Sequence, residues 1–129
     1  MTALVDGVAW SSIVTITTRT TLPTEPRGVL GVSGTNAFTG QYIEITFAVP
    51  NAVGTYTIGP GQISNGALQI PNNFASWTAS TTIGSGTIVV SSLTSTGAAG
   101  TFTLTLPPLS NTRATGTKLV TNGQFNVTF

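Results

Sequence analysis

The sequence predicts an all-β fold, an antiparallel sandwich of two sheets, with a closed up-and-down β-barrel as the alternative. Three observations predict this class. Apolar and polar residues alternate over most of the chain, as in Thr101–Leu106, where Phe102, Leu104 and Leu106 share one face. No segment repeats apolar residues at helical spacing. Turn-forming Gly, Pro, Asn-Gly and Asp-Gly separate the alternating runs, so we expect strands with one buried and one solvent-facing side.

The first expected strand covers residues 8–18 and bends near Ser11-Ser12. Asp6-Gly7 precedes it and favours a tight turn after Leu4-Val5, because both residue types accept left-handed backbone. At the other end of the chain, Asn122-Gly123 predicts a type I′ hairpin. The remaining expected strands are residues 28–33, 41–48, 53–58, 67–70, 75–80, 86–93, 100–106, 117–121 and 124–129. Because there are no crossover helices, neighbouring strands should be antiparallel.

Two segments of the chain are similar to each other. Gly40 and Gly54 each open an alternating run, as do Gly86 and Gly100, and 14 positions separate the two glycines of each pair. The pattern predicts a duplicated hairpin. The alternative is that Gly-Thr-aromatic triplets are simply common in β-proteins.

The inward-facing positions of the expected strands define a predicted hydrophobic core. Its members share alternation with polar neighbours and are mostly β-branched or aromatic, which suits a pleated, half-buried surface. They are Val14, Ile16, Leu30, Val32, Ile43, Ile45, Phe47, Tyr56, Ile58, Ile88, Val90, Phe102, Leu104, Leu106, Val120, Phe125 and Val127.

The composition bounds the function. Residues 1–129 suit a single domain, the chain has no cysteine or histidine, and only 5% of its residues are charged, against roughly 25% in typical soluble domains. The net charge of +1 gives no electrostatic basis for binding nucleic acid. A weakly charged surface favours association. Two interpretations remain open: a β-protein kept soluble by hydroxyls and amides, or a subunit of an ordered assembly.

Membrane insertion is not expected. No stretch approaches the roughly 18 apolar residues of a spanning helix. The segment Met1–Trp10 has neither the basic start nor the apolar run of a secretion signal, and no cysteine is present for lipidation.

The order of short motifs resembles a family of small bacterial all-β domains of unknown function, often found as surface lipoproteins. The resemblance covers nearly the whole chain. It rests on Asp6-Gly7 followed by Trp10, on the Gly-Thr-aromatic runs at Gly54 and Gly100, and on the closing Thr121–Val127 segment, TNGQFNV. It implies an extracellular-type module and supplies no catalytic or binding residues. The chain departs from the family pattern in lacking the signal peptide and lipidated cysteine, which leaves room for a virion or fibre component.

Catalysis is not expected. Acid–base, nucleophilic and metal chemistry depend mainly on histidine, cysteine and clustered carboxylates, and only Asp6, Glu25 and Glu44 are acidic. We therefore expect no catalytic site, no metal and no cofactor. Lys118, the one lysine, has two interpretations: an isopeptide bond to an asparagine near Glu44, or an exposed charge that protects an edge strand.

Carbohydrate is the best candidate ligand. Trp10 and Trp77 are amphipathic rings of the kind that stack on sugars, and Asn72 and Asn73 near Trp77 could add amide hydrogen bonds. The alternative is that both tryptophans fill the core.

The function predicted from the sequence is a non-enzymatic structural or interaction module. We expect a repeated subunit of a virion decoration, fibre or other extracellular assembly, located at a virion surface or outside the cell. Its expected partners are copies of itself, and alternatively a host lattice or capsid protein. The second hypothesis is a glycan-binding cell-surface domain.

Overall fold

The structure of the chain, a computed structural model, describes residues 1–22, 25–38 and 41–129, with side chains described outside residues 21–27 and 37–42. Eleven strands and one short 3-10 helix are present in these ranges. They are β1 (Thr2–Val5), β2 (Val8–Ser11), β3 (Val14–Leu22), β4 (Glu25–Phe38), β5 (Gln41–Pro50), β6 (Gly54–Ile58), β7 (Asn65–Ile70), η1 (Pro71–Asn73), β8 (Ala75–Ala79), β9 (Ser85–Leu93), β10 (Gly97–Leu106) and β11 (Lys118–Thr128).

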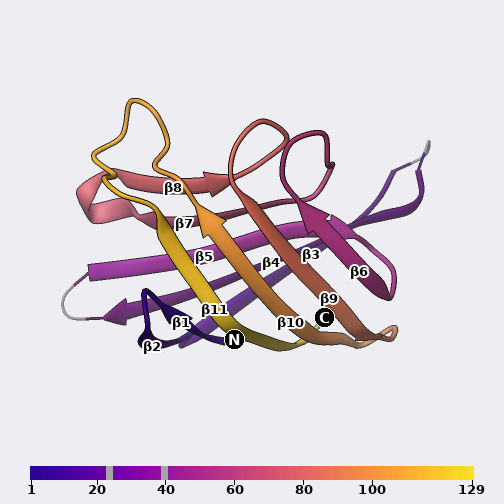
Figure 1. Ribbon diagram of the computed structural model, residues 1–129. Helices are drawn as coiled ribbons and strands as arrows, with labels where there is room; N and C mark the ends of the chain where they lie inside the picture. Colours follow the sequence, from indigo (N-terminus) through magenta and orange to yellow (C-terminus); the bar gives the residue numbers. More distant parts are fainter. Residues whose placement is uncertain (23–24, 39–40) are drawn as a thin grey trace.

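The strands form the predicted sandwich. A six-stranded sheet has the order β2-β1-β11-β10-β9-β6, and a five-stranded sheet has the order β3-β4-β5-β7-β8. In Figure 1 the first sheet runs obliquely across the second. Every ladder between the named strands is antiparallel, as predicted. The two sheets stay separate and neither closes on itself, so the barrel alternative is wrong.

The chain changes sheet soon after its first hairpin. The Asp6-Gly7 turn between β1 and β2 is confirmed, with φ of 50° and 81° at its two residues. The single strand predicted over residues 8–18 is divided between the two sheets. The amide of Ile13 already donates to the Thr35 carbonyl of the five-stranded sheet, at 2.9 Å. The bend expected near Ser12 is therefore the crossing point.

The second hairpin predicted from Asn122-Gly123 is wrong, because β11 runs unbroken through both residues. The strand carries one extra residue there relative to β10, which is a β-bulge, and Asn122 takes a φ of 52°. Gly123 pairs with Phe102, and a Cβ on this glycine would lie 2.6 Å from the phenylalanine ring. Glycine is needed here as space beneath an aromatic ring, not as a turn residue.

The duplicated hairpin is present in one copy only. β9 and β10, which contain Gly86 and Gly100, pair as predicted. β5 and β6 lie in different sheets, so the first copy is not a hairpin. The amide of Asn51 donates to the Gly28 carbonyl at 3.1 Å, which holds the chain at the end of β5 before it crosses to pair with β9. Gly40 lies outside the described residues.

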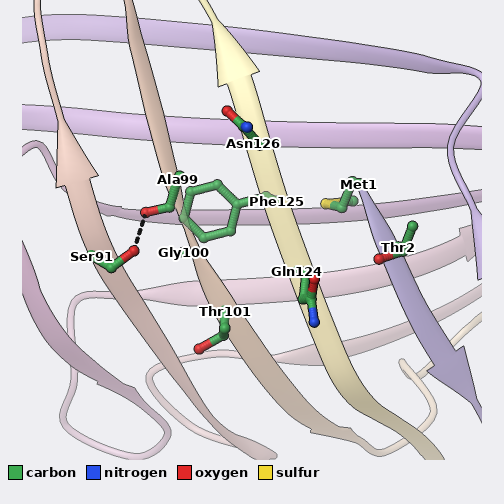
Figure 2. Close-up of a pocket in the computed structure, with 9 residues that line it drawn as sticks. All are labelled: Met1, Thr2, Ser91, Ala99, Gly100, Thr101, Gln124, Phe125 and Asn126. Atoms are coloured by element: carbon green, nitrogen blue, oxygen red, sulfur yellow. Dashed lines mark hydrogen bonds between the residues drawn. The ribbon is translucent and has the colours of Figure 1, made fainter.

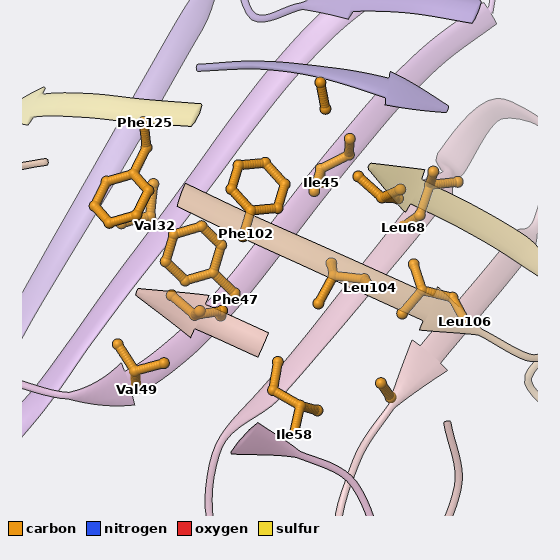
Figure 3. Close-up of a cluster of buried hydrophobic side chains, with 14 of the residues drawn as sticks. Val32, Ile45, Phe47, Val49, Ile58, Leu68, Phe102, Leu104, Leu106 and Phe125 are labelled. Atoms are coloured by element: carbon orange, nitrogen blue, oxygen red, sulfur yellow. The ribbon is translucent and has the colours of Figure 1, made fainter. Parts of the chain in front are cut away.

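The predicted core is largely confirmed, and phenylalanine rings form its centre. The ring centroid of Phe47 lies 5.3 Å from that of Phe102 and 5.1 Å from that of Phe125, which joins the two sheets (Figure 3). Ile43 and Tyr56 are only partly buried against this cluster. Buried residues absent from the predicted core are Ala3, Trp10, Val49, Leu68, Ala75, Trp77, Ala79 and Ala98.

The prediction that Val14 and Ile16 lie in the core is wrong, because their exposed fractions are 51% and 57%. The alternation in β3 is real, but its other face points inward. Thr17 Oγ1 donates to the Thr128 carbonyl at 3.2 Å. β3 is an edge strand, and its inner face meets the polar end of β11 instead of the aromatic core.

Replacing Phe102 by Ala should destabilise the fold by about 3–5 kcal/mol, because it removes a ring that is 1% exposed and leaves a cavity. Denaturant unfolding measures the effect. Thr103→Ala, one position along the same strand and exposed, is the control and should change stability by less than about 0.5 kcal/mol. Equal effects of the two substitutions would contradict the inward assignment of Phe102.

Candidate functional site

Trp77 is a structural residue in this fold. Its side chain is buried, with 4% exposure, and its indole N–H donates to the Gly116 carbonyl at 2.8 Å. The ammonium group of Lys118 lies 5.6 Å from the ring centroid, in cation–π range. The ring ties the segment before β11 to β8 and presents no open face for a sugar.

Trp10 is buried to the same extent and lies over Gly34 of β4. A Cβ on that glycine would lie 3.0 Å from the far edge of the indole ring, so the close approach depends on glycine. The indole Nε1 has no hydrogen-bond partner within the described part of the chain. Sugar stacking by either tryptophan would require the ring to leave the core, so core filling explains both residues better.

Asn72 and Asn73 are exposed, on η1, and the residue that follows them, Phe74, is an exposed aromatic. Phe74 has 76% of its surface exposed and a left-handed backbone, with φ of 52°. Such a conformation is uncommon for a bulky residue. Phe74 is not predicted by the alternation of apolar and polar residues, because neither its exposure nor its backbone conformation has a signal in the sequence.

Two main-chain hydrogen bonds fix Phe74. Its amide donates to the Pro71 carbonyl at 3.1 Å, and its carbonyl accepts from the Arg113 amide at 3.0 Å. The second bond brings the β10–β11 loop against η1, on the same side of the molecule in Figure 1. The exposed residues gathered there are named the Phe74 patch: Asn72, Asn73, Phe74, Asn111 and Arg113.

Asp6 and Lys118 form an ion pair at 2.6 Å, and Asp6 also accepts the Leu119 amide at 2.9 Å. Partial burial opposes ionisation of Asp6, but the Leu119 amide and the hydrogen bond and charge of Lys118 outweigh it. The pKa of Asp6 is therefore lowered from its ordinary value. This pair joins the β1–β2 turn to the start of β11.

The other acidic side chain in the described part of the chain is that of Glu44. It accepts a hydrogen bond from Ser33 at 2.6 Å on the five-stranded sheet, away from Asp6. The acid beside Lys118 is thus Asp6 and not Glu44, so the isopeptide arrangement is not formed. The side chain of Glu25 lies outside the described residues. No cluster of three or more His, Cys, Asp or Glu side chains occurs among the residues described.

The outer face of the six-stranded sheet is hydroxylated and shallow. Thr57, Thr87 and Thr103 lie side by side across β6, β9 and β10. Figure 2 shows an open groove of about 380 Å³ farther along the same sheet, where Ser91 Oγ donates to the Ala99 carbonyl at 3.1 Å. The side chains that line the groove include hydroxyls and amides and none that is ionisable. The α-amino group of Met1, which also borders the groove, donates to Ser12 Oγ at 2.8 Å, and no carboxylate among the described residues lines the groove beside it.

The sheet edges differ in how they are protected. The edge of β8 is covered by the segment after β10, since the Thr78 amide donates to Pro107 and the Leu109 amide to Ser76. β2 and β6 are edges of only four and five residues. β3 has nine residues. Two apolar side chains at its start, Val14 (51%) and Ile16 (57%), are exposed, as is Ile13 (73%) directly before it.

The one charged residue of β3 does not cover the start of this edge. Arg19 lies over the Phe129 ring, 4.5 Å from its centroid, and donates to Asn51 Oδ1 and to the Thr94 carbonyl. Residues 13–18 contain no charge and no proline. Charged side chains and proline are the usual protection of an edge strand, so this edge is open to pairing.

No family model matches the chain, and neither a curated protein nor a solved structure is significantly similar to it. None of the helical segments in the described part of the chain is long and apolar enough to cross a membrane.

The Asp6–Lys118 pair predicts a defined pH dependence. A lowered carboxyl pKa stabilises the fold above the pKa of the unfolded chain, and the contribution is lost as the pH falls through the folded value. Asp6→Asn should lower stability at neutral pH by at most about 1 kcal/mol, as expected for an exposed pair.

The difference between parent and variant should begin to shrink below roughly pH 4, near the pKa of the unfolded carboxyl, and should disappear once the pH is below the lowered pKa of the folded state. Denaturant unfolding of both proteins across this range is the measurement. Asparagine keeps the turn conformation, which isolates the charge. A difference that persists at acid pH would show that the pair is not its cause.

Proposed function

We propose that this chain is a non-enzymatic structural module, a repeated subunit of an extracellular or virion-surface assembly, which associates with copies of itself through the free edge of β3. The observation that carries this proposal is the exposure of Ile13, Val14 and Ile16 where the edge strand β3 begins, in a segment (residues 13–18) without charge or proline. Contiguous apolar surface on an unprotected edge favours addition of another strand.

A second copy of β3 fits this edge by symmetry. In an antiparallel pair centred on Thr15, Val14 of one copy lies opposite Ile16 of the other, and the reverse. The two strands then form one strip of four apolar side chains on the outer face of the joined sheets. Such cross-strand pairs each contribute about 0.2–1 kcal/mol, in addition to the apolar area that they bury.

The electrostatics permit this association. A net charge of +1 produces little repulsion between copies, and Arg19 is held against Phe129 away from the proposed centre. A host lattice or capsid protein that offers a strand could use the same edge. The glycan-binding alternative based on Trp10 and Trp77 has less support, because both rings are buried.

The subunit should self-associate, and Ile16→Lys should weaken the association by roughly a hundredfold. The change removes an apolar contact twice in a symmetric pair, at about 1.5 kcal/mol or more each. Light scattering over a concentration series measures the mass. Association should be nearly insensitive to salt, because few charges are available to screen.

Thr57→Lys is the matched control. It places the same charge on β6, an exposed edge of the other sheet, and should leave the association unchanged. A parent protein that stays monomeric at every concentration would refute self-association. Equal weakening by both lysine substitutions would place the contact elsewhere than β3.

A further inference from the structure

The backbone of Phe74 suggests that its exposure serves binding. A left-handed conformation costs a residue with a side chain about 1–2 kcal/mol, and a ring that is 76% exposed returns little of this through burial. Strain of this kind persists where surrounding contacts enforce it, and it is often found at ligand sites. Here the bonds to Pro71 and Arg113 enforce it, and they hold the ring outward.

The polar part of the Phe74 patch consists mainly of amides. Asn72 and Asn73 precede the ring directly, and Asn111 lies two residues before Arg113 in the adjoining loop. Each amide offers both donors and acceptors, which matches hydroxyl groups, since these also donate and accept. An apolar ring among several amides suits a ligand with an apolar C–H face and many hydroxyls.

Arg113 adds a positive charge that the fold does not use. Lys118 is paired with Asp6, and Arg19 is bound to Phe129, Asn51 and Thr94. Arg113 is exposed, and no side-chain hydrogen bond or ion pair involves its guanidinium within the described residues. A guanidinium that is left accessible is well suited to bind a carboxylate.

We propose that the Phe74 patch binds a carboxylated sugar of an acidic glycan. The sugar ring stacks on Phe74, its hydroxyls bond the asparagine amides, and its carboxylate pairs with Arg113. An acidic peptide could satisfy Arg113, but it offers neither the flat C–H face nor the hydroxyls that the ring and three amides match.

The proposal goes beyond self-association and uses a different part of the molecule. The patch adjoins β8, at the opposite edge of the five-stranded sheet from β3. Pairing through β3 therefore leaves the patch free. The two proposals can fail separately. Self-association through β3 should depend weakly on salt, whereas glycan binding at the Phe74 patch should depend on it strongly.

The test is a titration of the full chain with an oligosaccharide of galacturonic acid, followed by amide NMR shifts. The neutral galactose oligosaccharide of the same length and a glutamate peptide of the same charge are the comparison probes. Shifts should concentrate at residues 72–74 and 111–113, and affinity should fall as salt rises. Tighter binding of the glutamate peptide, or shifts centred elsewhere, would overturn the proposal.

Two variants test the contacts. Arg113→Gln should weaken binding of the acidic oligosaccharide by about tenfold or more, as expected for loss of a charge-assisted pair. Phe74→Gly should abolish measurable binding while its melting temperature stays within about 4 °C of the parent, because glycine accepts the left-handed backbone.

Ile63→Ser is the control, since Ile63 is 79% exposed in another loop, and its affinity should equal that of the parent. Phe74→Trp should retain binding, because it keeps an aromatic ring for stacking. Phe74→Leu should lose binding, because it has no ring. Unchanged affinity in Phe74→Gly, or a loss in Ile63→Ser equal to that in Phe74→Gly, would refute the site.

Discussion

The contact of Phe47 with Phe102 and Phe125 joins the two sheets, and much of the local geometry follows from it. Phe47 comes from β5 of one sheet, and the other two rings come from β10 and β11 of the second. Within the second sheet each ring lies opposite a glycine: Phe102 faces Gly123, and Phe125 faces Gly100. A Cβ on either glycine would lie within 2.7 Å of the facing ring, so the register of β10 with β11 is restricted by this complementarity.

The sequence contained enough information to predict the class and most of the core, because alternation reports directly on the two faces of a strand. Alternation does not show which face of an edge strand points inward. For that reason the prediction that Val14 and Ile16 lie in the core is wrong. The hairpin predicted at Asn122-Gly123 is absent because glycine also occurs where close packing leaves no room for a side chain, and not only in turns. β5 and β6 were expected to pair because sequence spacing does not reveal a change of sheet.

The candidate sites were predicted less well than the core. Asn72 and Asn73 are exposed in the structure, whereas the tryptophans proposed to act with them are not. A tryptophan in an alternating segment has the same pattern whether it fills a core or covers a ligand. Phe74 owes its exposure to the meeting of η1 with a loop some 40 residues later in the chain, a tertiary contact that no local pattern encodes.

The covering of β8 also limits how the sheets can grow. Because the Thr78 amide and the Ser76 carbonyl are already bonded to the segment of Pro107 and Leu109, the five-stranded sheet can accept a new strand only at β3. Pairing through β3 uses the one edge of this sheet that is open, so it stops at two copies. The result is a continuous ten-stranded sheet with a covered β8 at each end. It does not propagate as a ribbon and has no nucleus or critical concentration. Any longer array must therefore use a second, different contact. The segment that covers β8 prevents amyloid-like addition of further strands at that edge.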